Sequence, residues 1–202
     1  MFDFVDKPEY WNERYRNSKA NWDMKSATPI FIDILKEGKI IQPGKIFIAG
    51  SGKGYDAVAA AKFGYEVTAI DFSSEAIAFS QKLAAVDNVR INFITENIFT
   101  LDQSFENSFD VVYEYVTYCS INPERHEEYI RKLSSFIKPG GKLIALLFPV
   151  ENVEGGPPFG VDPVEFFSIA KNFLILEQST KIINSIKPRK GREVLQVYSK
   201  LT

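Results

Sequence analysis

The chain has 202 residues, of which 45% are hydrophobic and 25% charged, as in a globular protein with one α/β domain. Its formal net charge of −2 excludes binding dominated by nucleic-acid phosphates. We find neither an apolar run of about 20 residues nor a signal-peptide pattern, and therefore expect a cytoplasmic protein without a membrane partner. A lone cysteine, Cys119, and a lone histidine, His126, leave no basis for an intramolecular disulfide or a zinc site.

Helical and strand-like periods alternate along the chain. After a polar, aromatic-rich opening, the expected elements in chain order are a helix over 29–36, a strand over 45–49, a helix over 55–63, a strand over 66–70, a helix that Ser73 or Ser74 caps and that runs to about residue 85, strands over 92–95 and 109–114, a helix over 124–137, a strand over 142–148, a helix over 164–172, and closing strands over 173–177 and 194–200. The stretch 138–141 is expected to end the fourth of these helices.

This alternation predicts one doubly wound, Rossmann-like α/β domain over residues 1–202. We expect a mostly parallel seven-stranded sheet with an antiparallel strand at the C-terminus.

A glycine-rich turn lies between the first predicted strand and the helix that follows it. Gly50, Gly52 and Gly54 let the backbone turn tightly and approach a ligand. The spacing G-x-G-x-G differs from the G-x-G-x-x-G of dinucleotide sites, and Lys53 lacks the Ser or Thr that a P-loop requires after it. The alternative is a simple strand-to-helix turn.

Polar residues follow three further strands of the predicted sheet. Asp71 ends the second strand about 20 residues after the glycine turn, where an acid binds ribose hydroxyls in doubly wound sheets. The alternative role for Asp71 is to cap the next helix. Asn97 and Ile98 follow the third strand and suit an adenine, and Tyr115 ends the fourth. All four positions lie at the edge where such sheets bind ligands.

With these features, the sequence resembles the thiopurine methyltransferase family, closest to its halide and thiol methyltransferases. The resemblance spans nearly the whole chain, and the G-x-G-x-G turn is the form found in class I methyltransferases. It rests on the motifs Tyr10-Trp11-Asn12-Glu13-Arg14-Tyr15, Asn21-Trp22-Asp23, Thr28-Pro29, Tyr113-Glu114-Tyr115, Phe148-Pro149, Gly155-Gly156-Pro157-Pro158-Phe159, Val161-Asp162 and Arg189-Lys190-Gly191-Arg192-Glu193.

The resemblance implies a class I methyltransferase domain that binds S-adenosylmethionine and releases S-adenosylhomocysteine. Residues 1–28 then form an N-terminal helical lid. The cofactor-binding residues would be Trp11, Trp22, Gly50, Gly52, Gly54, Asp71, Asn97, Ile98 and Tyr115. The alternative for the two tryptophans is a hydrophobic anchor for the first helix.

The acceptor pocket implied by the resemblance is mostly apolar. Its residues would be Tyr10, Tyr15, Phe148, Pro157, Pro158 and Phe159. Such a pocket favours a small, soft nucleophile such as a halide or a thiol, which needs no catalytic acid or base. Two departures from the family are Phe148, where Tyr is common, and Ser51, where Cys is frequent.

The sequence leaves three alternative functions open. The first is a methyltransferase whose acceptor is a larger thiol or a metalloid, the second is a catalytically silent cofactor-binding protein, and the third is an NAD-dependent oxidoreductase on a related sheet. We expect a monomer or weak homodimer with a small-molecule acceptor, no nucleic-acid partner and no metal. We expect His126 to be an exposed helix residue and Cys119 a buried small hydrophobe.

Overall fold

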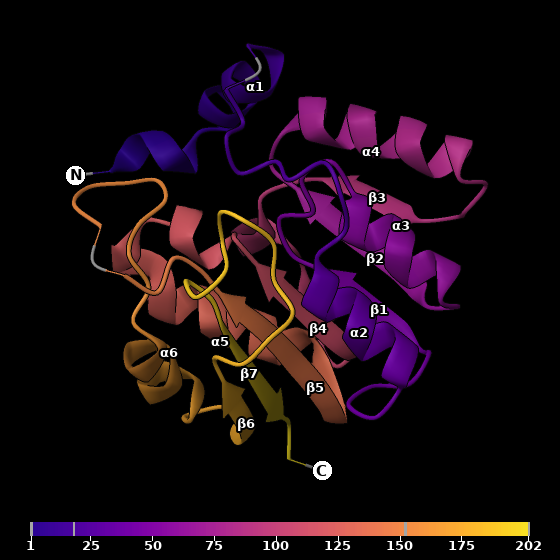
Figure 1. The fold of residues 1–202 in the computed structure, drawn as a ribbon, viewed down its shortest axis with the longest axis vertical. Helices are drawn as coiled ribbons and strands as arrows, with labels where there is room; N and C mark the ends of the chain where they lie inside the picture. The colour runs from indigo at the N-terminus through magenta and orange to yellow at the C-terminus, as the bar shows by residue number, and fades with distance from the viewer. Residues whose placement is uncertain (1, 18, 152, 202) are drawn as a thin grey trace. The chain divides into compact units, whose positions relative to one another are not determined.

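The structure is a computed structural model that describes residues 2–17, 19–151 and 153–201 (Figure 1). The chain divides into two compact units, Met1–Leu101 and Asp102–Thr202. A single domain over residues 1–202 stays a prediction. Of the predicted lid segment, residues 1 and 18 lie outside the described residues. Among the residues that the structure describes, none of the helices is long and apolar enough to cross a bilayer.

The first unit carries three parallel strands in the order β3-β2-β1. Helices α3 and α4 pack against β2, and α2 contacts α3 (Figure 1). The elements are η1 (Asp3–Asp6), α1 (Pro8–Arg16), α2 (Pro29–Glu37), β1 (Lys45–Ile48), α3 (Tyr55–Lys62), β2 (Glu66–Asp71), α4 (Ser74–Val86), β3 (Asn92–Thr95) and η2 (Ile98–Thr100). Each strand and helix predicted for this part of the chain is confirmed, with ends that differ by one or two residues.

Local sequence signals set the ends of these helices. Pro29 begins α2, where its missing N–H costs nothing, and Gly38 ends it with a left-handed φ of 59°. Ser73 caps α4, because its side chain accepts a hydrogen bond from the backbone N–H of Ala76. Helix α1 differs from the others of this unit because none of its residues is buried.

The second unit carries four strands in the order β4-β5-β7-β6. Strands β4 and β5 are parallel, whereas β7 runs antiparallel to both β5 and β6. The elements are η3 (Gln103–Phe105), β4 (Phe109–Tyr115), η4 (Tyr118–Ser120), η5 (Pro123–Arg125), α5 (His126–Phe136), β5 (Ile137–Leu147), α6 (Pro163–Ala170), β6 (Ile175–Thr180) and β7 (Val194–Ser199). The seven strands form the mixed sheet that the sequence predicts, with an antiparallel strand at the C-terminus.

Strand β5 begins earlier than predicted. Residues 138–141 were expected to end a helix, but they continue the strand that starts at Ile137. The pairing of β4 with β5 shifts register between Phe109 and Val111, and Gly140 has a φ of 78°. A bulge of this kind lets a Pro-Gly-Gly stretch lie within a strand, which period and propensity alone do not indicate.

The prediction that His126 is exposed is wrong, because its side chain is 6% exposed. Its ring stacks on Tyr118 with centroids 3.9 Å apart, and burial lowers the pKa of His126 to about 4. The imidazole is therefore neutral at neutral pH. Helix α5 buries His126 together with Tyr129, Leu133 and Phe136, which lie on its core face. The expectation that Cys119 is buried is confirmed.

Candidate functional site

The glycine turn joins β1 to α3. Gly50, Gly52 and Gly54 have φ values of 52°, 55° and 78°, a region that residues with a Cβ rarely adopt. At Gly54 an added Cβ would also lie 2.8 Å from the Cβ of Ser80. The Ser80 hydroxyl donates a hydrogen bond to the carbonyl of Gly52 at 2.8 Å, which holds the turn against α4. The backbone of the three glycines is thus held in a fixed conformation beside the end of β1, with no side chain to block a ligand.

Asp71, the last residue of β2, is tied to this turn. One carboxylate oxygen accepts the N–H of Gly52 and the other accepts the N–H of Ser73, both at 2.8 Å. The cap of α4 is Ser73 itself, so Asp71 supports the capping residue without being the cap. Burial raises the pKa of Asp71 to about 6, against backbone hydrogen bonds from Ser73, Gly52 and Phe72. A carboxylate has about four lone-pair sites, so acceptor capacity remains for a ligand hydroxyl.

A buried hydroxyl lies within the glycine turn. The backbone N–H of Ser51 donates to the carbonyl of Ile70 at 2.7 Å, which anchors the turn to β2. The Ser51 hydroxyl, however, has no hydrogen-bond partner among the residues that the structure describes. Buried polar groups are rarely left unpaired. Together with the glycine backbone and Asp71, this hydroxyl fits a site that holds a polar ligand such as a nucleoside.

Asn97 and Ile98 follow β3, as predicted. The side-chain oxygen of Asn97 accepts the N–H of Phe99 at 3.0 Å and so begins η2. This cap occupies the oxygen, so any direct contact with a base would come from the amide nitrogen. Ile98 is 7% exposed and packs inward. The pair can therefore offer one donor and an apolar wall, and its role beside adenine stays a prediction.

The N-terminal segment carries an aromatic cluster. The indole rings of Trp11 and Trp22 meet edge to face with centroids 5.6 Å apart, and Tyr10 packs on Trp11 at 5.0 Å. The indole N–H of Trp11 donates to the carbonyl of Val5 at 2.8 Å, so Trp11 also joins α1 to η1 within the N-terminal segment. The anchor role and the lid role that were alternatives for these residues are thus compatible.

Tyr15 lies against the glycine turn. Its hydroxyl accepts the indole N–H of Trp22 at 3.3 Å, and a Cβ added at Gly52 would lie 3.2 Å from that hydroxyl oxygen. Burial, aided by the charge of Asp71, raises the pKa of Tyr15. The structure therefore brings Tyr15, predicted for the acceptor pocket, close to the predicted cofactor residues.

Two polar contacts fasten the end of the N-terminal segment, and the sequence did not single them out. Lys53, inside the glycine turn, forms an ion pair with Asp23 at 2.6 Å. Asp56, in the first turn of α3, accepts both the N–H and the hydroxyl of Thr28 at 2.6 and 2.7 Å. The sequence feature that could have indicated the first contact is Lys53, a lysine in a turn that is not a P-loop. Lys53 pairs with a carboxylate of the protein itself.

In the second unit, Tyr115 and Phe148 both contact one buried arginine. The guanidinium carbon of Arg189 lies 4.9 Å from the ring centroid of Tyr115 and 4.6 Å from that of Phe148. The Tyr115 hydroxyl donates to Glu193 at 2.5 Å, and Ser185 donates to the other carboxylate oxygen. Arg189 is 2% exposed and Glu193 3%. Neither was predicted as a site residue, although both belong to a motif that carries the resemblance.

The proline-rich loop of the second unit is only partly buried. Phe159 is 5% exposed, whereas Pro157 is half-buried and Pro158 exposed. The N–H of Phe159 donates to the carbonyl of Cys119 at 2.7 Å. A Cβ at Gly156 would lie 2.3 Å from the Phe159 ring, so glycine is required there. Burial raises the pKa of the Cys119 thiol, which keeps it protonated and unreactive.

Glu114 lies beside Tyr115 in β4 and is 1% exposed. One carboxylate oxygen accepts the N–H groups of Thr117 at 3.1 Å and Tyr118 at 2.8 Å, and the other accepts the hydroxyl of Tyr129. Burial raises the pKa of Glu114 to about 7. This acid joins β4 to η4 and to α5, and its contacts are internal.

A doubly wound sheet, glycine backbone after β1 and a carboxylate at the end of β2 form the arrangement with which such sheets bind a nucleoside-containing cofactor. The family match defines the class of the protein, an S-adenosylmethionine-dependent methyltransferase of class I. Residues 6–194 match the thiopurine S-methyltransferase (TPMT) family, and the chain belongs to this family. The family resemblance, the fold class and the cofactor predicted from the sequence are confirmed.

Individual relatives agree with this assignment. The chain is 29% identical over 194 residues to the probable thiol methyltransferase 2 of Arabidopsis thaliana, covering 94% of this chain and 84% of that protein. It is 27% identical over 197 residues to thiocyanate methyltransferase 1 of the same plant, covering 95% and 84%. Among solved structures, the 1,6-didemethyltoxoflavin-N1-methyltransferase of Burkholderia thailandensis, crystallised with S-adenosylhomocysteine, superposes with a TM-score of 0.75 at 18% identity, covering 100% of this chain and 89% of the other. The last likeness concerns the fold.

Proposed function

We propose that the protein transfers the methyl group of S-adenosylmethionine to a small, soft nucleophile such as a thiol or a halide. The observation that carries the proposal is Arg189, a buried cation in contact with the rings of Tyr115 and Phe148. Arg189 also shares a hydrogen bond with the side chain of Tyr115. A buried cation beside aromatic rings favours an anion that loses its hydration shell easily, because desolvation then costs little. The names of the relatives, a thiol and a thiocyanate methyltransferase, support the same acceptor class.

The first unit is proposed to hold the cofactor. Asp71 accepts the ribose hydroxyls, the backbone of Gly50, Gly52 and Gly54 faces the methionine part, and Asn97 with Ile98 meets the base. Ser51 is added to the predicted set because its buried hydroxyl has no partner among the described residues. Trp11 and Trp22 cover the site and exclude water, and aromatic rings stabilise a sulfonium by cation–π interaction.

When bound, the cofactor supplies an electrophilic methyl group on a sulfonium. Transfer of that methyl group to the acceptor would leave neutral S-adenosylhomocysteine as the second product. Arg189 orients the anionic acceptor. No residue is assigned as a general base, because a thiolate or a halide has no proton to lose. Tyr10, Tyr15, Pro157, Pro158 and Phe159 stay predicted acceptor contacts.

The proposal is tested by measuring S-adenosylhomocysteine release with iodide, hydrosulfide, thiocyanate and an aromatic thiol as acceptors. We expect turnover with at least one of the small anions. Arg189→Met should raise the KM for that anion by about tenfold or more, because hydrogen bonds to charged groups contribute about 1.5–3 kcal/mol. Lys190→Met is the matched control, since Lys190 is the exposed neighbour of Arg189.

Several outcomes separate the alternatives. Turnover with the aromatic thiol alone would favour the larger acceptor, and cofactor binding without turnover on any acceptor would favour a silent binding protein. An Arg189→Met variant that keeps the wild-type KM would contradict the role of Arg189. The cytoplasmic location and the monomeric or weakly dimeric state stay predictions from the sequence.

A further inference from the structure

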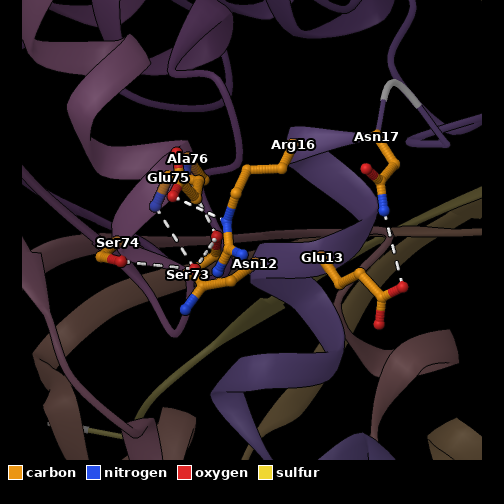
Figure 2. A network of polar contacts seen from close by, with 8 residues as sticks. All are labelled: Asn12, Glu13, Arg16, Asn17, Ser73, Ser74, Glu75 and Ala76. Carbon is orange, nitrogen blue, oxygen red and sulfur yellow. Dashed lines mark hydrogen bonds and ion pairs between the residues drawn. The ribbon is translucent and has the colours of Figure 1, made fainter.

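Polar contacts join helix α1 to the start of α4. Each described residue of α1 keeps part of its surface exposed, so the core alone does not fix its position. Asn12 and Arg16, four residues apart, lie on one face of α1 and both reach the first turn of α4 (Figure 2). Among the helices and strands of the unit, α4 makes the most extensive contact with α1.

The side-chain oxygen of Asn12 is the centre of this network. It accepts the hydroxyl of Ser73 at 2.7 Å, and the backbone N–H of Glu75 and the hydroxyl of Ser74 at 3.4 Å (Figure 2). Arg16 adds a hydrogen-bonded ion pair to Glu75 at 3.0 Å. An oxygen at this place is favoured because the N–H groups in the first turn of a helix lack intrahelical acceptors.

The same serine that Asn12 contacts also supports the proposed ribose acid. Ser73 is fully buried, and its N–H donates to Asp71 at 2.8 Å while its hydroxyl donates to Asn12. Its hydroxyl oxygen also accepts the N–H of Ala76 at 3.2 Å. Asp71, Ser73 and Asn12 therefore form one continuous hydrogen-bonded path from the cofactor acid to the helix that carries Trp11.

We infer that Asn12 is a positioning residue that couples docking of the N-terminal segment to occupancy of the cofactor site. The inference rests on the proposed covering role of that segment. A ribose bound to Asp71 restrains the loop at Ser73, and the restrained loop holds Asn12 and with it α1. Coupling of this kind is reciprocal, so the docked helix strengthens cofactor binding by the same factor.

The test compares Asn12→Ala with Asn12→Asp, which keeps a side-chain oxygen, and with Asn17→Ala. Asn17 follows the last turn of α1, and its side-chain amide donates to the exposed Glu13 at 3.5 Å. We expect Asn12→Ala to raise the Kd and KM for S-adenosylmethionine about two- to tenfold, the range that one hydrogen bond supports, with little change in kcat. Asn12→Asp and Asn17→Ala should remain within about twofold of wild type.

Trypsin supplies the readout of helix docking, because Arg14, Arg16 and Lys19 offer cleavage sites in this segment. S-adenosylhomocysteine should slow cleavage there in the wild type and in Asn12→Asp, and much less in Asn12→Ala. Equal protection of wild type and Asn12→Ala would overturn the inference while leaving the covering role intact. No protection in the wild type would overturn both. The Kd and the trypsin readout do not depend on the methyl acceptor.

Discussion

Strands β2 and β4 each carry a carboxylate at the carboxyl end, and the two are used differently. Asp71 accepts backbone N–H groups, those of Gly52 and Ser73 at 2.8 Å, and keeps part of its surface exposed. Glu114 accepts two backbone N–H groups and the hydroxyl of Tyr129, and is 1% exposed. Burial raises both pKa values, to about 6 and about 7. A raised pKa therefore does not identify the binding acid, whereas the exposed surface of Asp71 does.

The largest effect is expected for Asp71→Ala. The variant loses the charged acceptor of two ribose hydroxyls, and each such hydrogen bond contributes about 1.5–3 kcal/mol. We expect the Kd for S-adenosylmethionine, measured by calorimetric titration, to rise about a hundredfold or more. Asp87→Ala, which removes a carboxylate paired with Lys62 on the surface, is the control. A Kd for Asp71→Ala within a few fold of wild type would contradict the ribose role.

Glu114→Ala should change stability, with cofactor affinity spared. It leaves the N–H groups of Thr117 and Tyr118 and the hydroxyl of Tyr129 without their acceptor. Each orphaned buried group costs about 1–3 kcal/mol, so we expect the free energy of unfolding in urea to fall by roughly 3 kcal/mol or more. Folded Glu114→Ala should bind S-adenosylmethionine as wild type does. Unchanged stability with lost binding would reverse the roles of the two acids.

The smallest effect concerns pH. Since the charged form of Asp71 is the better acceptor, affinity for S-adenosylmethionine should fall as pH falls through the pKa of about 6. Going from pH 7 to pH 5 should weaken binding by about tenfold, because a carboxyl with that pKa is mostly protonated at pH 5. Dividing the Kd of the wild type by the Kd of Asp71→Asn at each pH isolates the titration of Asp71, since asparagine does not titrate. A Kd ratio that stays constant from pH 7 to pH 5 would show that Asp71 does not contact the ribose.

Much of the first unit is predictable because its signals are local. Glycines with positive φ, the Ser73 cap and an acid at the end of β2 all follow from short stretches of sequence. The position of Asp71 follows from the order of the elements, because the carboxyl ends of parallel strands share one edge of the sheet. These features were identified without knowledge of the packing.

The features that sequence reasoning missed depend on contacts between distant residues. The burial of His126 follows from the packing of α5, and the contact of Arg189 with Tyr115 joins residues more than 70 positions apart. Asn12 likewise reaches Ser73 across 61 positions. Neither composition nor period encodes such pairings, because each side chain alone is compatible with an exposed position.

A crystal structure with S-adenosylhomocysteine tests the central claim, the different use of the two acids, most directly. The account predicts that the ribose hydroxyls lie within hydrogen-bonding distance of the Asp71 carboxylate, about 2.5–3.0 Å, and that Glu114 keeps its contacts to Thr117, Tyr118 and Tyr129 without touching the ligand. A ligand bound by Glu114, or a ribose without contact to Asp71, would contradict it.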